Sequence, residues 1–211
     1  MNETELRDKT EQARRRYDRI SGIYDRMEAP MERGNFKGWR SLIWNDVKGP
    51  RVLEVGVGTG KNMAYYPKDL EITAIDFSPG MLSKARAKAQ QQGVKVDLKL
   101  MDAQHLDFPD STFDTVLATF VFCSVPDPVR GLRELRRVVK PDGKILLLEH
   151  VRPRGTAGTA TDIVNPAVVR IWGANINRCT VENVQDAGLV VDHVDNLLRD
   201  FVKLIVASPG K

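Results

Sequence analysis

The chain has 211 residues, of which 42% are hydrophobic and 28% charged, as is usual for one globular domain. Its net charge of +4 is a small excess of 32 basic over 28 acidic residues, and the basic run at 14–16 has no interleaved aromatics, so nucleic-acid binding is not predicted. No apolar run reaches the length of a membrane span, and the polar N-terminus lacks the apolar core of a signal peptide. We therefore expect a cytoplasmic protein. The two cysteines, Cys123 and Cys179, predict neither a metal site nor a disulfide framework, and we expect both to be inert packing thiols.

Residues 1–48 have helical periodicity. Apolar residues recur at heptad spacing, at Leu6, Ala13, Ile20 and Met27, interleaved with Tyr17, Tyr24 and Met31. Ser21-Gly22 is predicted to interrupt this helix. Tyr17 and Tyr24 are seven residues apart, so we expect them on one helix face.

Residues 51–60, RVLEVGVGTG, predict an apolar strand that runs into a glycine turn. Gly56, Gly58 and Gly60 let the backbone approach a ligand closely, with its N–H groups pointing outward. In the dinucleotide fingerprint G-x-G-x-x-G the third glycine would stand at 61, where this chain has Lys61. The spacing therefore argues against a nicotinamide or flavin dinucleotide.

Strand and helix signals alternate after this point. Strands are predicted at 51–55, 71–76, 94–101, 113–120 and 144–150. Ser78-Pro79 and Asp127-Pro128 are predicted to open helices that end at Gly93 and at the turn 141–143. The Gly-, Thr- and Pro-rich stretch between 150 and 180 is predicted to be irregular. A short helix at 180–187 and an antiparallel hairpin of strands 189–197 and 201–208 follow.

Five β-α repeats and a terminal hairpin predict an α/β fold with a doubly wound, mostly parallel sheet in a single domain, 1–211. It divides into a helical lid (1–48), a core (49–150) and a final segment (151–211). Ligands of such folds lie beyond the carboxyl ends of the strands. We therefore expect one crevice to be rimmed by the strand-end residues Glu54, Asp76, Asp102, Phe120 and His150.

Asp76 follows Gly60 by sixteen residues, near the interval at which an acid binds ribose hydroxyls in nucleotide folds. A carboxylate suits a cis-diol because it accepts two hydrogen bonds at once. The alternative is a solvated aspartate in a turn.

The acid-x-G-x-G-x-G motif at 54–60 resembles that of the class I S-adenosylmethionine-dependent methyltransferases. FDTVLATFVFCSVPDP, LRELRRVVKPDGKILLLEH and the N-terminal YDRISGIYD are similar to the type 11, or ubiquinone/menaquinone-biosynthesis-like, branch. The resemblance runs from about Tyr17 to the C-terminus. It implies a Rossmann-like seven-stranded sheet, S-adenosylmethionine as cofactor and no metal.

The resemblance also implies cofactor-binding roles. The glycine loop, 56–60, would lie beneath the carboxypropyl and ribose part, and Asp102 and the Ala103 N–H would meet adenine. The full set is Tyr17, Glu54, Gly56, Gly58, Gly60, Asp76, Phe77, Met81, Asp102, Ala103 and Thr119. Three purely structural roles stay open. Asp102 could be a helix N-cap, Phe77 and Met81 could be core residues, and Tyr17 and Tyr24 could belong to a core-packing seam of the N-terminal helix.

The candidate catalytic residues are His150, Tyr17 and Tyr24. His150 stands at a predicted strand end and is either a general base or a structural histidine, while His105 and His193 lie elsewhere. Asn175, Asn177 and Arg178 resemble a stretch that lines the acceptor pocket of small relatives, or they cap a loop.

For the acceptor, the chain resembles compact bacterial phosphatidylethanolamine N-methyltransferases and the thiol S-methyltransferases of the methyltransferase-like 7 group. A quinone-precursor C-methyltransferase is a third possibility, and a cofactor-binding sensor without activity is a fourth. We predict a small or amphipathic acceptor, with a phospholipid amine first. The arginine-flanked N-terminal seam predicts peripheral contact with an anionic membrane, on its inner face. The methylated atom, the number of transfers and the oligomeric state stay open.

Overall fold

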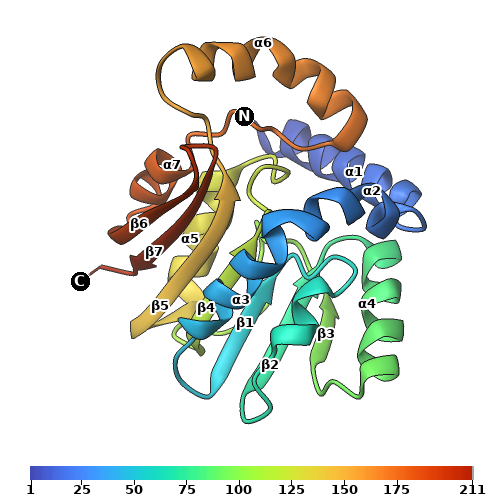
Figure 1. Cartoon of the computed structure of the whole chain (residues 1–211). Helices are drawn as coiled ribbons and strands as arrows, with labels where there is room; N and C mark the ends of the chain where they lie inside the picture. Colours follow the sequence, from blue (N-terminus) through green and yellow to red (C-terminus); the bar gives the residue numbers. More distant parts are fainter. Residues whose placement is uncertain (211) are drawn as a thin grey trace.

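The computed structural model describes residues 1–210, apart from the side chain of Arg33. It contains a seven-stranded sheet in the order β3-β2-β1-β4-β5-β7-β6 (Figure 1). β1 to β5 pair in parallel, and β7 runs antiparallel to both of its neighbours. The predicted fold class and terminal hairpin are confirmed. The strands are β1 (Arg51–Val55), β2 (Glu71–Asp76), β3 (Asp97–Leu100), β4 (Phe113–Thr119), β5 (Val139–His150), β6 (Val190–Leu198) and β7 (Val202–Ser208).

Helices cover both faces of the sheet. On one face, α5 (Pro128–Val138) and α7 (Thr180–Asp186) bury Leu132, Leu135 and Val184 against β1, β4 and β5. The other face is covered by α3 (Lys37–Asn45), the short 3₁₀ helix η2 (Lys61–Tyr65) and α4 (Pro79–Gln92). The central strands are buried on both faces, which explains their near-continuous apolar sequence.

The helix boundaries follow the capping signals of the sequence. The Ser78 and Asp127 side chains accept the first-turn N–H groups of Met81 and Arg130, with proline next in each case. Gly93 ends α4 in the left-handed conformation (φ +64°). The predicted starts of α4 and α5 and the predicted end of α4 are confirmed.

The N-terminal segment forms α1 (Glu3–Ile20), α2 (Tyr24–Met31) and the π-helical turn η1 (Glu32–Phe36), which leads into α3. The predicted break at Ser21-Gly22 is confirmed. It places Tyr17 and Tyr24 on different helices, so the expectation of one shared helix face is wrong. Their rings still meet across the turn that joins the two helices, with centroids 6.2 Å apart.

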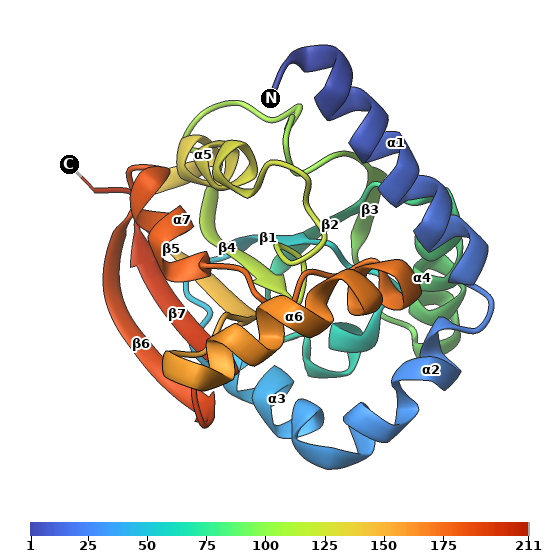
Figure 2. The same ribbon diagram turned by 90° about the horizontal axis from the view of Figure 1, so that it is seen from above.

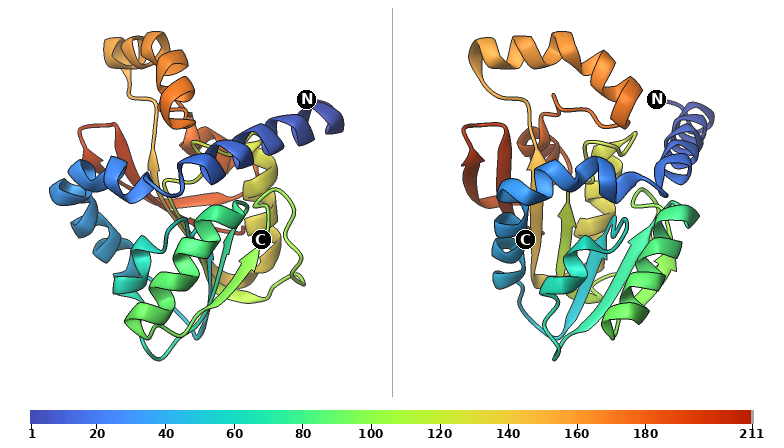
Figure 3. Two further views of the ribbon diagram at one scale, coloured as in Figure 1. Left: turned by 90° about the vertical axis from the view of Figure 1, so that its right-hand side faces the viewer. Right: turned by 45° about the vertical axis from the view of Figure 1, so that its right-hand side comes forward.

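The largest departure from prediction is α6 (Gly155–Trp172), an 18-residue helix within the stretch predicted to be irregular. Its glycines, threonines and Pro166 are typical of loops, but they are interspersed with Ala, Val and Ile. Gly173, with φ +82°, ends the helix by donating its N–H to the Val169 carbonyl. Figures 2 and 3 show α6 lying beyond the carboxyl ends of the strands, across the top of the sheet.

Three further expectations are wrong in detail. Within residues 101–112, between β3 and β4, there are turns and no helix, and the β1–β2 connection has only η2, so five full β-α repeats are not formed. β3 begins at Asp97 rather than 94, whereas β5 begins at Val139 because the expected turn at 141–143 is part of the strand. Cys123 is buried, but Cys179 is exposed and is not a packing thiol. Through residue 210, no helix combines the length and apolarity needed to cross a membrane.

Candidate active site

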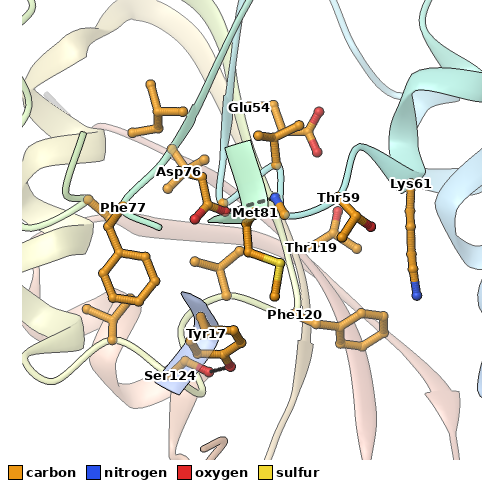
Figure 4. A pocket seen from close by; sticks show the side chains of 18 of the residues that line it. Tyr17, Glu54, Thr59, Lys61, Asp76, Phe77, Met81, Thr119, Phe120 and Ser124 are labelled. Carbon is orange, nitrogen blue, oxygen red and sulfur yellow. Dashed lines mark hydrogen bonds between the residues drawn. The ribbon is translucent and has the colours of Figure 1, made fainter. Parts of the chain in front are cut away.

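A pocket opens at the carboxyl ends of β1 and β4, where the strand order reverses (Figure 4). The sheet contributes Glu54, Asp76, Thr119 and Phe120, and the lid helices contribute Tyr17, Tyr24 and Glu28. Phe77, Met81, Asp102 and Ala103 also line it. Residues from four strand ends and from the N-terminal helices thus meet at one place.

The glycine loop has the conformation that its sequence requires. Gly56, Gly58 and Gly60 have φ of +70°, +56° and +81°. A Cβ on Gly56 would lie 2.4 Å from the Val121 side chain, whereas a Cβ on Gly58 would have no atom within 4 Å. Gly58 is therefore the open side of the loop. Gly60 does not line the pocket; it packs against Met63 and precedes η2.

Asp76 ties the second strand to this loop. Its carboxylate accepts the N–H of Gly58 at 2.8 Å and that of Ser78 at 2.9 Å. Only 6% of the residue is exposed, and burial raises its pKa to about 6. The acid is thus held in place by backbone donors, and the remaining lone pairs of its oxygens are available to a ligand.

Glu54 lies beneath the loop in a buried polar network. It accepts hydrogen bonds from Asn62 Nδ2 at 2.8 Å and from the Tyr66 hydroxyl, and burial raises its pKa to about 7. Arg40 Nη1 in turn donates to Asn62 Oδ1 at 2.9 Å. Since its carboxylate is already engaged by two side chains, Glu54 shapes the loop as well as lining the pocket.

The lid closes the pocket through polar contacts. The Tyr17 hydroxyl lies 2.5 Å from Ser124 Oγ, and Asp18 accepts hydrogen bonds from Ser78 Oγ at 2.6 Å and from the Gly80 N–H at 2.9 Å. The Tyr17 ring also lies 5.9 Å from that of Phe77 (Figure 4). Burial raises the pKa of the Tyr17 hydroxyl, so this tyrosine stays protonated at neutral pH.

An ion pair joins α2 to the glycine-loop side of the pocket. Lys61, which replaces the third glycine of the dinucleotide fingerprint, pairs with Glu28 and lies 5.3 Å from the centroid of the Tyr24 ring. Burial raises the pKa of Tyr24, and the neighbouring Glu28 charge adds to this. Both tyrosines can therefore donate hydrogen bonds but are poor bases near neutrality.

His150 is absent from the residues that line the pocket, so the expected crevice of five strand ends contains only four of them. Its ring packs on Phe120, at 4.5 Å between centroids, and near Phe36, at 6.0 Å. Burial lowers its pKa to about 4, so it is neutral at pH 7. Its role as a base stays a prediction.

Asn175, Asn177 and Arg178, which the sequence suggested for the acceptor pocket, make contacts outside its lining. Asn175 donates both its backbone N–H and its Nδ2 to the Cys123 carbonyl, at 2.8 and 3.0 Å, and Arg178 donates to the Val125 carbonyl. Asn177 donates to Asp162 of α6 at 3.1 Å. Asn175 and Arg178 thus fix the loop at 120–126, Asn177 contacts α6, and none of the three lines the pocket.

Sequence reasoning missed several residues of this site. Glu149 is fully buried and accepts the N–H groups of Val121 and Phe122 at 2.8 and 3.0 Å, and burial raises its pKa to about 7. The only available signal was an acid inside the apolar run ILLLEH. The other missed residues are Glu28, Arg40, Asn62, Tyr66 and Ser124. No group of His, Cys, Asp and Glu side chains that could hold a metal occurs within the described part of the chain.

Comparison with known proteins agrees with this geometry. A family model described as a methyltransferase domain matches residues 53–147. The phosphatidylethanolamine N-methyltransferase of Cereibacter sphaeroides is 45% identical over 113 residues, which cover 53% of this chain and 56% of that protein. The demethylmenaquinone methyltransferase of Renibacterium salmoninarum is 32% identical over 166 residues, covering 77% and 68%.

A solved structure shows the same fold. The S-adenosylmethionine-dependent methyltransferase of Thermotoga maritima, described as a possible histamine N-methyltransferase, has a TM-score of 0.71 at 20% identity and covers 93% of this chain and 99% of its own. The sheet order and the glycine loop are therefore those of a class I methyltransferase. With the matches above, the chain belongs to the S-adenosylmethionine-dependent methyltransferase family. The matched segments span 56% to 68% of the two curated relatives.

Proposed function

We propose that this chain transfers a methyl group from S-adenosylmethionine to the amino group of a phospholipid, phosphatidylethanolamine. The observation that carries the proposal is the 45% identity to a protein named as a phosphatidylethanolamine N-methyltransferase. The identity to the demethylmenaquinone methyltransferase is lower, at 32%, although over a longer segment. Quinone C-methylation is therefore the second candidate.

The residues of the pocket fit the proposed cofactor. The open side of Gly58 admits a ligand against the backbone, and the Asp76 carboxylate next to it suits the two hydroxyls of a ribose. Met81 and Phe77 offer apolar surface for a purine, and Asp102 lies in the same pocket. When bound, S-adenosylmethionine supplies an electrophilic methyl group on its sulfonium.

The lid side of the pocket suits a cationic acceptor. The faces of aromatic rings attract cations, and the Tyr17 and Tyr24 rings both line this side. The Glu28 carboxylate lines it too; one of its oxygens is paired with Lys61, and the other is available to accept a hydrogen bond from an amine. We propose that these three side chains hold the amine, which releases its proton to bulk water before the lid closes. The nitrogen lone pair of the free amine then attacks the methyl carbon as the C–S bond to the sulfonium breaks.

The proposal is tested by supplying purified protein with S-adenosylmethionine labelled in its methyl group. Dispersed phosphatidylethanolamine, small thiols and a demethylated quinone precursor are offered as separate acceptors. We expect label in the lipid, and far less at a subsaturating cofactor concentration with the Asp76→Asn variant, which controls for contaminating enzymes. Label in thiols or in the quinone alone would refute the lipid assignment. Binding of S-adenosylhomocysteine without transfer to any acceptor would favour a sensor.

A further inference from the structure

The helix α6 leaves its large apolar side chains unburied. Two of its polar side chains face the protein instead, because Asn165 Oδ1 accepts the Ile176 N–H at 2.9 Å and Thr161 is buried, whereas Thr156, Thr159, Asp162 and Arg170 are exposed. Its large apolar side chains face outward. They are Ile163, Val164, Ile171 and Trp172, exposed to 76%, 47%, 57% and 41%. A surface helix of a soluble protein normally buries such residues.

The turn between β6 and β7 extends this apolar area. Leu198 and Phe201 are exposed there to 43% and 38%. The turn lies against the start of α6, because Asp200 accepts the Arg154 N–H at 2.9 Å and the Phe201 carbonyl accepts the Val151 N–H at 2.9 Å. The outer side of α6 and this turn both lie beyond the carboxyl ends of the strands (Figures 1 and 2). We call them together the α6 surface.

The charges of the α6 surface are positive once ion pairs are counted. Arg154, Arg170 and Arg199 are exposed, and none of the three has an ion-pair partner within residues 1–210. The two carboxylates of these elements are neutralised: Asp162 pairs with Arg152 at 2.8 Å, and Asp200 pairs with Lys203 at 2.7 Å. The combination of exposed apolar side chains, a tryptophan and unpaired arginines matches an anionic membrane interface.

The N-terminal seam, by contrast, is already used in packing. Leu6 is buried, and the Tyr17 hydroxyl is hydrogen-bonded to Ser124. Glu11 pairs with both Arg14 and Arg15 and offsets one of their two charges. Part of this seam therefore closes the pocket, and its contact with a membrane stays a prediction.

We propose that the α6 surface is the face by which this protein rests on a bilayer containing anionic phospholipid. The proposal deepens the lipid N-methyltransferase function proposed above and names the contact through which that enzyme reaches its substrate. It also accounts for the position of α6. Asn165 donates to Asn175 at 3.2 Å, and Asn175 donates to the Cys123 carbonyl of the loop that borders the pocket. A membrane in contact with the outer side of α6 would thus lie beside the pocket.

Vesicle sedimentation tests the surface directly, with phosphatidylcholine vesicles made with and without phosphatidylglycerol. The apolar test variant is Ile163→Ser/Ile171→Ser, with the exposed pair Leu100→Ser/Val190→Ser as its control. The charge test variant is Arg154→Gln/Arg170→Gln/Arg199→Gln, with Lys48→Gln/Lys68→Gln/Lys84→Gln as its control. We expect wild type to sediment with anionic vesicles. The apolar variant should bind at least about tenfold more weakly and the charge variant about 100-fold more weakly at low salt.

Methyl transfer to a short-chain, monomeric phosphatidylethanolamine separates the two proposals. The α6 variants should keep wild-type rates on this monomer while losing activity on vesicles. Vesicle binding equal to wild type in both test variants would overturn the surface proposal. So would a wild type that ignores vesicles but self-associates through α6 by light scattering. Vesicle binding that depends on α6, in a protein that methylates no form of the lipid, would support the surface and refute the substrate.

Discussion

The Asp76→Asn variant tests the cofactor site most sharply, because affinity and stability should respond differently. With its pKa at about 6 instead of 3.8, the buried carboxyl holds its proton more tightly in the folded state than in the unfolded chain. The free energy of unfolding is therefore highest below about pH 4, where the group is protonated in both states, and it falls as pH rises to 6. The total fall is about 3 kcal/mol, from about two pKa units at about 1.4 kcal/mol each, and it is the destabilisation caused by the ionised group above pH 6.

An asparagine at this position has no charge to bury, which removes that destabilisation. Its amide can accept only one of the two N–H groups of Gly58 and Ser78, and the loss of one charge-assisted hydrogen bond costs about 1.5–3 kcal/mol. These two effects nearly cancel, so unfolding without ligand should change by no more than about 1–2 kcal/mol. In this variant the ribose diol of the cofactor loses a charged group that accepts two hydrogen bonds. The affinity for the cofactor should therefore fall by about 2–4 kcal/mol, or about 30- to 1,000-fold.

Titration calorimetry with S-adenosylhomocysteine and urea unfolding of the free protein measure the two quantities. The control is Asp97→Asn, on an exposed aspartate of β3, which should change neither. The affinity of wild type should also fall as pH drops through about 6, because Asp76 then gains a proton. Asp76→Asn should lack this step. A variant that binds like wild type would refute the role assigned to Asp76, and a large loss of stability would refute the cancellation.

Three further variants probe the lid and His150. Tyr17→Phe removes the hydrogen bond to Ser124, which is worth about 1 kcal/mol. Amide hydrogen exchange in α1, measured by mass spectrometry, should therefore become about fivefold faster. Unchanged exchange would show that this bond does not hold the lid. Glu28→Gln should raise KM for an amine acceptor about tenfold while the affinity for S-adenosylhomocysteine changes less than threefold, and the reverse pattern would place Glu28 with the cofactor. His150→Phe keeps a ring against Phe120 and removes the group whose pKa burial lowers to about 4. The contribution of His150 to stability should fall by about 3 kcal/mol from pH 6.5 to 4, because the unfolded chain takes up that proton first, whereas the buried carboxyls Asp76, Glu54 and Glu149 shift stability in the opposite direction in both proteins. The difference in unfolding free energy between variant and wild type should therefore change by about 3 kcal/mol in favour of the variant over this range, as measured by urea unfolding. A large fall in kcat at pH 8 in this variant would instead support His150 as a base.

The cofactor side of the site was predictable because it follows from strand order. Parallel strands end at the same edge of a sheet, so an acid directly after an apolar run, such as Asp76, must lie beside the glycine loop. Neither Arg40 nor Asn62 follows a strand; they come from α3 and η2. Their meeting at Glu54 depends on how these helices pack, which no local sequence pattern contains.

His150 shows a limit of the same reasoning. Successive side chains of a strand point to opposite faces, so only one of the two neighbours at the end of β5 can point toward the backbone N–H groups at 121–122. Glu149 points there and accepts the Val121 and Phe122 N–H groups, whereas His150 faces Phe36 and Phe120. The helix α6 was missed for a different reason. Its glycines, threonines and Pro166 are residues that local sequence rules assign to loops, and they outweighed the Ala, Val and Ile between them.

The lid contacts connect cofactor binding to lid closure. Asp18 accepts hydrogen bonds from Ser78 and Gly80, and Ser78 also donates its N–H to Asp76. Thr59, in the glycine loop, donates to Asp25 of α2 at 2.5 Å. The elements that we propose to hold the ribose therefore also hold the lid, so a ligand that orders them stabilises the closed arrangement. By reciprocity, the closed lid must then tighten the cofactor by the same free energy.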